Sequence, residues 1–290
     1  MSDLVWHTDP PPLRAPILVT AFEGWFDVGG AATGAVEWLS ERATGTHVAH
    51  VDPDPYFDFS ERRPFARLEG GVRVIDWPAN DVHTLALPDR GRDLVLMVGV
   101  EPHLRWRGFA DLVLEVAERC RAALLVTLGA TIAEVPHTRP FVVAGSTVDP
   151  HLAGALGLDR PSYEGPTGVV GVLHDLFTGV GVPAVSLRVS VPHYVAGTPN
   201  PKGSRALLER FERVTGLPTD WAELDRAAEE WEARVNEAMN DDDDVLAYVR
   251  GLEQASDTRM SRELPSAEDL AAEFERFLRR QRPDEGRSGG

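Results

Sequence analysis

Residues 17–39 constrain the fold of this chain more than any other stretch. They begin with an apolar, largely β-branched run at 17–22, continue through a glycine-containing loop at 23–27, and end in a segment of small residues at 28–39. A short apolar run that ends at a glycine loop predicts a buried strand, and Asp27 is a suitable N-cap for a helix that follows. We therefore expect the first strand and helix of an α/β domain. The exposed N–H groups at the start of that helix would favour an anion.

Comparable apolar runs recur along the chain and alternate with helical patterns. The predicted strands are 46–51, 93–98, 123–128, 141–147 and 184–191, and the predicted helices are 106–121, 150–156 and a helix that starts after 164–168 and ends near 177. Residues 67–77 predict a hairpin that turns at Gly70-Gly71, which would give the sheet an antiparallel portion. This order predicts a three-layer α/β/α domain over 13–217, with a mixed, mostly parallel sheet covered on both faces.

The composition changes near Pro218. Residues 219–290 contain 20 Asp or Glu and 10 Arg, so they supply −10 of the net charge of −17. They show no strand pattern. Apolar residues recur at spacings of three and four, which is typical of a helix packed lengthwise on another: Trp221, Leu224, Ala228, Trp231, Val235 and Ala238. Two more helices are predicted, one after the acidic run 241–244 and one from Ser266. We expect a small all-helical domain over 218–282 and a disordered tail over 283–290.

Charge and composition exclude several classes of function. A protein with a net charge of −17 and an isoelectric point near 4.9 is a poor partner for nucleic acid or for an anionic membrane surface. Its one cysteine, Cys120, is expected to be a buried hydrophobe rather than a nucleophile. The first residues contain no apolar segment of the kind that directs secretion. We expect a cytoplasmic protein.

Candidate site residues follow the predicted strands, because ligands of open α/β sheets bind beyond the carboxyl ends of the strands. Glu101 and His137 are the candidate catalytic groups. The candidate ligand-binding residues are Glu23, Gly24, Trp25, Phe26, Asp27, Gly29, Gly30, Glu101, His103, Arg105, His137, Arg139, Glu164, Thr167 and His193. If the strands are parallel, these residues meet at one edge of the sheet.

The motifs within this set do not specify a cofactor. His103, His137 and His193 could supply zinc ligands, but their spacing matches no local zinc motif, so we expect no metal. Gly29-Gly30-x-x-x-Gly34 matches neither the dinucleotide fingerprint nor a P-loop. The arginines near the site could clamp an anion or pair with neighbouring carboxylates, and we favour the pairing: Arg62, Arg63, Arg105 and Arg139.

Several dispersed segments, taken together, resemble the proteasome assembly chaperone 2 family, in its bacterial branch with an added helical C-terminus. They are TAFEGWFDVGGAA at 20–32, VEP at 100–102, LGA at 128–130, VPHTRP at 135–140 and YEGPTG at 163–168. They occur in the family's order, and the resemblance extends from about residue 16 to 280.

The resemblance implies an α/β/α fold similar to nucleoside phosphorylases and a homo-oligomer of three or more copies. For eukaryotic and archaeal relatives it also implies a non-enzymatic role in assembling or binding proteasome α-subunits. Relatives that bind proteasomes can end in a hydrophobic-Tyr-any tail, whereas this sequence ends Arg287-Ser288-Gly289-Gly290. We therefore do not expect docking through that tail.

Two hypotheses follow. The first is a non-catalytic binding or assembly protein that associates with itself, with Trp221, Trp231, Tyr56, Phe57 and Phe59 as candidate contact residues. For the two tryptophans we favour packing within the chain. The alternative is an enzyme of the nucleoside phosphorylase or hydrolase type, or a ligase, that acts on a small anionic substrate at the strand ends. A ligase of the ATP-grasp type would need lysines over its nucleotide, and Lys202 is the only lysine.

Overall fold

The computed structural model describes residues 2–42 and 44–263. The chain divides into two compact units, residues 1–239 and 240–290. The first unit contains a large sheet, a separate hairpin and the helices α1 to α6, and the second contains α7 (Asp243–Glu263). No helix of the described residues is both long and apolar enough to cross a lipid bilayer.

Eight strands form the main sheet, in the order β1-β3-β6-β7-β2-β8-β10-β9. The four central strands β7, β2, β8 and β10 run parallel, and the flanking strands are antiparallel. The sheet is therefore mixed, with a parallel centre, as the sequence predicted. Its strands are β1 (Leu4–Trp6), β2 (Ile17–Glu23), β3 (Gly45–Val51), β6 (Asn80–Leu85), β7 (Leu94–Val100), β8 (Leu124–Ala133), β9 (Val143–Ser146) and β10 (Ala184–Pro192).

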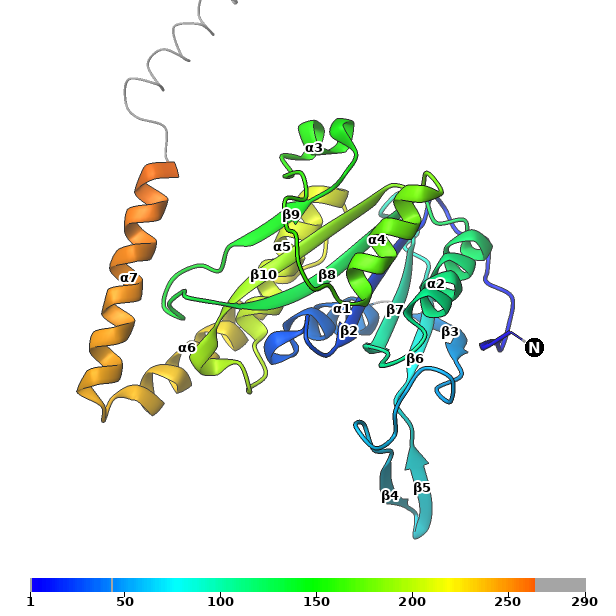
Figure 1. Cartoon of the computed structure of the whole chain (residues 1–290), viewed down its shortest axis with the longest axis horizontal. Helices are drawn as coiled ribbons and strands as arrows, with labels where there is room; N and C mark the ends of the chain where they lie inside the picture. Colours follow the sequence, from blue (N-terminus) through cyan, green and yellow to red (C-terminus); the bar gives the residue numbers. More distant parts are fainter. Residues whose placement is uncertain (1, 43, 264–290) are drawn as a thin grey trace, which may run out of the picture. The chain divides into compact units, whose positions relative to one another are not determined.

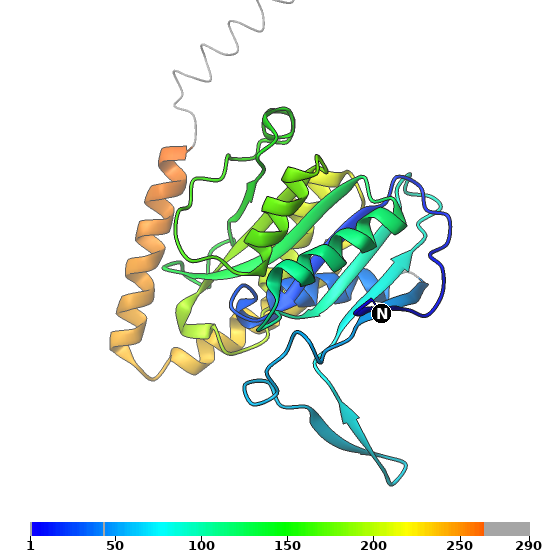
Figure 2. The same cartoon turned by 45° about the vertical axis from the view of Figure 1, so that its right-hand side comes forward.

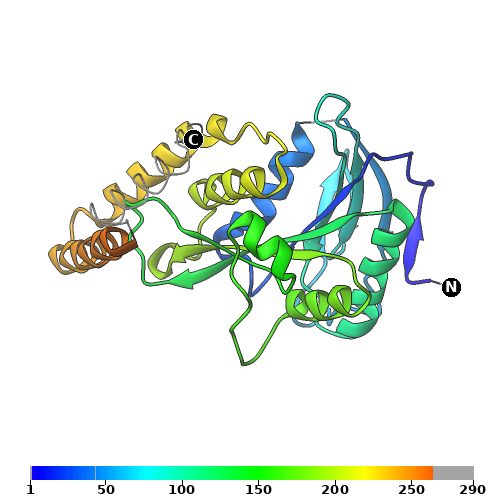
Figure 3. The same cartoon turned by 90° about the horizontal axis from the view of Figure 1, so that it is seen from above.

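Helices cover both faces of this sheet (Figure 3). One face packs against α1 (Ala31–Glu41) and α5 (Pro201–Thr215), and the other packs against α2 (Trp106–Cys120) and α4 (Val169–Gly179). The short helix α3 (Pro150–Leu156) follows β9, and α6 (Asp225–Met239) packs on α5. The three-layer α/β/α architecture is confirmed.

The strand β2 shows why the apolar runs are nearly continuous. Val19 and Ala21 point into the core under α1, whereas Leu18 and Phe22 point into the core under α2. A central strand that is buried on both faces has no solvent face, so its sequence does not alternate. On the helices the predicted stripe is also present, since Phe109, Leu112, Val113, Val116 and Cys120 of α2 are all buried.

The hairpin at 67–77 forms, but its predicted place in the sheet is wrong. β4 (Phe65–Glu69) and β5 (Val72–Asp76) pair only with each other and make a separate two-stranded sheet. The hairpin projects from the body of the first unit (Figures 1 and 2). The antiparallel part of the main sheet comes instead from β1, β3, β6 and β9.

The elements β1, β6 and α5 were not predicted. β6 contains only two apolar residues, Val82 and Leu85, so it lacks the continuous apolar run of the central strands. One of its faces is only partly covered, at Asp81 and His83. α5 is a polar helix whose apolar stripe, including Leu207, Leu208 and Phe211, covers the sheet beside α1. These elements complete the sheet edge and one helical layer.

Helices follow residue 217, as expected. Ala228, Trp231 and Val235 of α6 are buried, and Trp231 and Val235 join the core that includes α5. The second unit includes α7, which begins in the acidic run. The independence of a domain over 218–282 stays a prediction, and the helix from Ser266 and the tail 283–290 lie outside the described residues.

Candidate functional site

The loop between β2 and α1 is organised by the buried carboxylate of Asp27. Its Oδ1 accepts hydrogen bonds from the N–H groups of Ala32 (2.7 Å) and Thr33 (3.2 Å), and its Oδ2 accepts one from the Thr33 hydroxyl (2.5 Å). Burial raises the pKa of Asp27 above its usual value, and these hydrogen bonds oppose that rise. Asp27 thus caps α1 across a short 3₁₀ turn, Val28–Gly30. The helix start that we expected to favour an external anion therefore already holds a carboxylate.

Glu101, a candidate catalytic residue, caps α4. Its Oε1 accepts a hydrogen bond from the N–H of Val169 at 2.9 Å, and its own N–H donates to the carbonyl oxygen of Glu23 at 2.8 Å. A Cβ atom at Gly24 would lie 3.0 Å from Glu101, and one at Gly168 would lie 2.6 Å from it. Two glycines thus leave room for this carboxylate, which joins the ends of β2 and β7 to the start of α4.

His137, the other candidate, is a buried packing residue with 1% of its surface exposed. Its Nδ1 lies 2.9 Å from the Tyr194 hydroxyl, and its Nε2 lies 3.0 Å from Oδ1 of Asn236 on α6. Because Oδ1 can only accept, these partners select the tautomer with a proton on Nε2. The ring therefore ties the loop after β8 to the turn after β10 and to α6.

Lys202 contributes to the same junction. Its Nζ donates to the carbonyl oxygen of His137 at 2.5 Å and pairs with Glu232 on α6 at 2.5 Å. The only lysine of the chain is thus engaged within the protein. It is not placed to hold a nucleotide of the kind that an ATP-grasp ligase would bind.

Two of the four arginines that we considered as anion clamps form ion pairs within the chain. Arg62 binds both carboxylate oxygens of Glu23, at 2.7 and 2.5 Å, and Arg105 lies 3.3 Å from Asp3. Both pairs are partly exposed to solvent, so each contributes little to stability. They agree with the favoured interpretation of pairing.

An open hollow of about 1020 Å³ lies at the carboxyl ends of β2 and β7, between them and the start of α1. It contains five of the predicted ligand-binding residues, which are Glu23, Gly24, Asp27, Gly29 and Gly30. Its charged lining comprises four carboxylates, from Glu23, Asp27, Glu37 and Asp81, and one guanidinium, from Arg234. Such a lining repels anions, so the hollow is unsuited to the small anionic substrate of the enzyme hypothesis.

The remaining predicted residues are distributed around this edge and do not form one site. Trp25 is 67% exposed, and Glu164 and Thr167 lie on an exposed loop before α4. The ring of Phe26 packs over β8, where a Cβ atom at Gly129 would lie 1.9 Å from it. His103 accepts a hydrogen bond from the N–H of Asp58. Arg139 and His193 lie on the loops that flank His137, away from the hollow.

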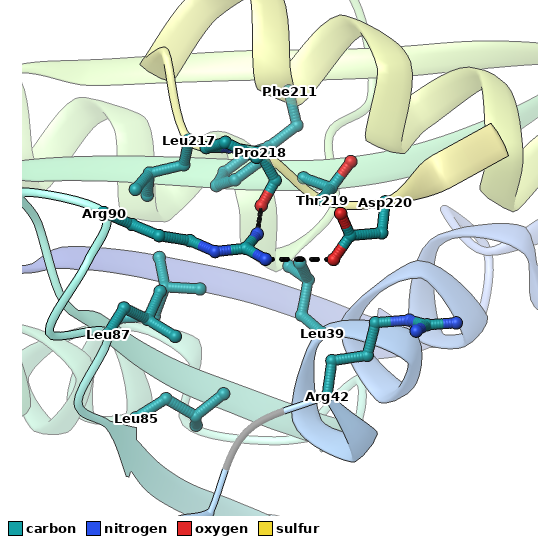
Figure 4. Close-up of a pocket in the computed structure, with 11 residues that line it drawn as sticks. Leu39, Arg42, Leu85, Leu87, Arg90, Phe211, Leu217, Pro218, Thr219 and Asp220 are labelled. Carbon is teal, nitrogen blue, oxygen red and sulfur yellow. Dashed lines mark hydrogen bonds and ion pairs between the residues drawn. The ribbon is translucent and has the colours of Figure 1, made fainter. Parts of the chain in front are cut away.

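A second, small cavity lies at the opposite end of the parallel strands, near the start of β7 (Figure 4). Arg90 points toward the segment after α5, where it donates to the carbonyl oxygen of Pro218 and bonds the carboxylate of Asp220 at 3.0 Å. The cavity measures about 50 Å³, and five of its eleven lining residues are leucines. This space is comparable to that of one or two water molecules, so it is a packing void rather than a ligand site.

Two further predictions concerned reactivity and partner contacts. Burial raises the pKa of the Cys120 thiol to about 11, which agrees with an inert side chain. Tyr56 and Phe57 were candidate contact residues for a partner, but they are only 1% and 4% exposed and pack in the core of this chain. Trp231 is 2% exposed and packs within the chain, as favoured.

The exposed apolar surface that the sequence analysis missed is the β4–β5 hairpin. Phe65, Leu68 and Val72 are 70%, 75% and 67% exposed. Because cross-strand partners share a face, Leu68 lies with Ala66 and Ile75 on one face, and Phe65 lies with Val72 on the other. Apolar and polar residues are mixed along both strands, so each face of the hairpin carries some apolar side chains. No apolar segment next to the hairpin in the sequence could cover them, and this was the signal for an exposed apolar surface.

Comparison with known proteins identifies the family. The model of the PAC2 family matches residues 21–239. A PAC2 family protein from Streptomyces avermitilis is 43% identical, with a TM-score of 0.75 over 81% of this chain and 99% of that one. A proteasome-assembly chaperone homologue from Mycobacterium tuberculosis is 40% identical, with a TM-score of 0.73 over 80% of this chain and 99% of that one.

More distant similarity extends to archaea. The proteasome activator PbaB of Pyrococcus furiosus is 19% identical, with a TM-score of 0.66 over 81% of this chain and 97% of that one, which shows a shared fold alone. No curated protein matches the sequence. The family match covers most of the chain and agrees with the motifs at 20–32, 128–130 and 163–168, so this chain belongs to the PAC2 family.

Proposed function

We propose that this chain is a non-catalytic cytoplasmic assembly protein that associates with itself and binds proteasome subunits. Its family and its similarity to a proteasome-assembly chaperone homologue support a chaperone-like role. The hairpin is the observation that carries the proposal. A chain that works through contact with other proteins needs an exposed apolar surface more than it needs a pocket.

The hairpin has the properties of a contact element. An isolated two-stranded hairpin is marginally stable in water, and contiguous exposed apolar patches mark interaction sites. Here Arg67 forms ion pairs with Asp76 (2.7 Å) and with Glu69 (2.9 Å), which stabilise the two strands. At the base of the hairpin, Phe59 packs against Trp77. The apolar side chains at the tip and on both faces remain in contact with solvent, where a protein partner can cover them.

The charged groups of the strand ends support a non-catalytic role. Glu101 and Asp27 cap helices, His137 joins three segments, and the acidic hollow between β2, β7 and α1 disfavours anions. These side chains are engaged in contacts within the fold, whereas the enzyme hypothesis needs them free to contact a substrate. The residues at the strand ends are thus better suited to stabilising the fold than to catalysing a reaction.

The test replaces an exposed apolar residue of the hairpin with a charged one. Leu68→Asp should leave the melting temperature nearly unchanged, because Leu68 is 75% exposed and surface changes usually alter stability by no more than about 0.5 kcal/mol. It should lower self-association in analytical ultracentrifugation and reduce capture of proteasome α-subunits. A second variant, Arg73→Asp, changes the residue that pairs with Leu68 across the hairpin. It tests whether a change of charge at this place is enough to weaken association. The matched control is Val180→Asp, which is 51% exposed and lies at the end of α4.

Two results would contradict the proposal. One is a wild-type protein that stays monomeric and captures no proteasome subunit. The other is a thermal shift with a nucleoside, phosphate or ATP that Glu23→Gln abolishes. Glu23 lines the hollow and pairs on the surface with Arg62, so its replacement tests the enzyme hypothesis without removing a helix cap.

A further inference from the structure

A pocket of about 170 Å³ lies against the last two strands of the main sheet, β9 and β10. The chain segment 159–163 forms its remaining wall. The polar side chains that matter here are those of Arg160, Arg188, Asp159, Ser146, Ser162 and Ser186. None of them lines the acidic hollow at the ends of β2 and β7, so the two cavities are separate.

The strand β10 supplies the floor of this pocket because its sequence alternates. The odd-numbered residues of 185–191 are apolar and are buried in the core beside α1 and α5. Ser186 and Arg188 therefore lie on the opposite face of the sheet. The register pairs Ser146 of β9 with Ser186, so these two hydroxyl groups share that face. Arg188 is exposed and Ser186 is partly exposed, so a ligand can reach both.

The wall segment is attached to the edge of the sheet at one end. The N–H of Asp159 donates to the carbonyl oxygen of Gly145 at 2.8 Å, and the N–H of Thr147 donates to the carbonyl oxygen of Asp159 at 3.0 Å. Residues 160–163 follow directly and are exposed. The segment thus brings a second arginine to the pocket from outside the sheet.

Both arginines of the pocket lack a partner within the described part of the chain. Neither Arg160 nor Arg188 forms an ion pair or a hydrogen bond there, in contrast to Arg62, which binds Glu23. The hydroxyl groups of the three serines make no hydrogen bond with a described residue either. Because each guanidinium carries five N–H donors, the pocket contains many donors and few acceptors.

This set of donors matches a phosphate group. Guanidinium groups bind phosphate with two parallel hydrogen bonds, and a phosphate offers more acceptor oxygens than a carboxylate does. The Asp159 carboxylate can accept a hydrogen bond from a proton that the phosphate keeps or from a hydroxyl group of an ester. The volume limits the ligand, because a cavity of about 150 Å³ holds one benzene molecule.

The local charge also favours an anion. The charged lining consists of two guanidinium groups and one carboxylate, whereas the whole chain has a net charge of −17. At about 0.1 M salt, exposed charges more than about 10 Å apart are largely screened from each other. The two nearby arginines therefore outweigh the distant acidic residues.

We propose that this pocket binds a small anion of the phosphate class, inorganic phosphate or a small phosphate monoester, between Arg160 and Arg188. The bound anion joins the segment 159–163 to β10. It therefore stabilises the loop that leads to α4.

The experiment titrates the full chain with inorganic phosphate at constant ionic strength, with chloride as the other anion. Isothermal titration should give one site per chain with a Kd of about 1 mM or tighter. Arg160→Gln and Arg188→Gln should each weaken binding about ten- to hundredfold, because each removes hydrogen bonds to a charged group. Glycerol 3-phosphate is the second probe. Tighter binding of this ester identifies a monoester as the ligand, and tighter binding of phosphate identifies the free anion.

The matched control is Arg107→Gln, which removes the same charge from an exposed arginine of α2 and should bind phosphate as the wild type does. Phosphate should also slow hydrogen exchange at the backbone N–H groups of 159–163. Melting curves establish that each variant is folded.

Three results would overturn the proposal. The first is a wild-type chain that binds neither probe. The second is unchanged binding in folded Arg160→Gln and Arg188→Gln variants, or an equal loss in Arg107→Gln. The third is a loss of binding in Glu23→Gln, which would place the anion in the acidic hollow. Self-association and proteasome binding do not enter these measurements, so they test the pocket separately from the proposed function.

Discussion

Replacing His137 tests whether this residue serves structure or catalysis. His137→Phe keeps most of the ring volume and removes the contacts of Nδ1 with Tyr194 and of Nε2 with Asn236. Each hydrogen bond contributes about 0.5–1.5 kcal/mol, and the partners that remain are left partly unsatisfied. We expect a loss of about 2 kcal/mol in the free energy of unfolding. His137→Ala also opens a cavity, and by analogy with other buried aromatic residues it should cost about 3–5 kcal/mol.

Urea denaturation followed by tryptophan fluorescence measures these differences. For a chain of this size, 2 kcal/mol corresponds to a fall of about 4–8 °C in melting temperature. Tyr194→Phe should cost less alone, and its effect should not add fully to that of His137→Phe, because the two share a hydrogen bond. His151→Ala is the exposed control. A His137→Phe variant with wild-type stability would refute the structural role assigned to this histidine.

Three further predictions concern residues that hold helices and loops against the sheet. Asp27→Ala removes the cap of α1 and should cost about 1–2 kcal/mol in chemical denaturation, whereas an unchanged midpoint would exclude the capping role. Burial lowers the pKa of His174 to about 4, so stability should fall as the pH drops from about 6.5 toward 4, by at most about 3 kcal/mol because the ring keeps some exposure. His174→Asn should flatten that part of the pH profile. Gly129→Ala should displace the ring of Phe26 and cost about 1–3 kcal/mol, whereas Gly154→Ala, which has open space, should not destabilise the protein.

The sequence predicted the core of the fold because the responsible signals are local. The run at 17–22 and the stripe of α2 are periodic patterns that depend only on neighbouring residues. β6 was missed because its cover and its partners come from distant segments. The helix α5 was missed although it carries local signals, which are Pro201 at its start, an apolar stripe and Gly216 at its end. The hairpin was recognised as a hairpin, but whether it joins the main sheet depends on pairing partners far away in the chain.

The candidate site was predicted less well, for a related reason. Following the strand ends selected residues next to the carboxyl ends of β2 and β7, among them Glu23 and Glu101. It could not distinguish a side chain that faces solvent from one that caps a helix, as Glu101 does, or that is buried between loops, as His137 does. That distinction depends on which N–H groups and rings the fold brings within about 3 Å, and sequence spacing does not encode it.

By itself, the sequence determined the α/β/α class, the family and the acidic helical C-terminal part, because apolar periodicity, motif order and net charge are properties of the chain. Only the tertiary structure decided which polar residues are engaged in capping and packing, and that the hairpin stands apart with its apolar faces exposed. It also brought His7, which follows β1, beside His47 and His50 of β3. The physical reason is that contacts between strands are set by register and layer packing, which join residues regardless of their distance along the chain.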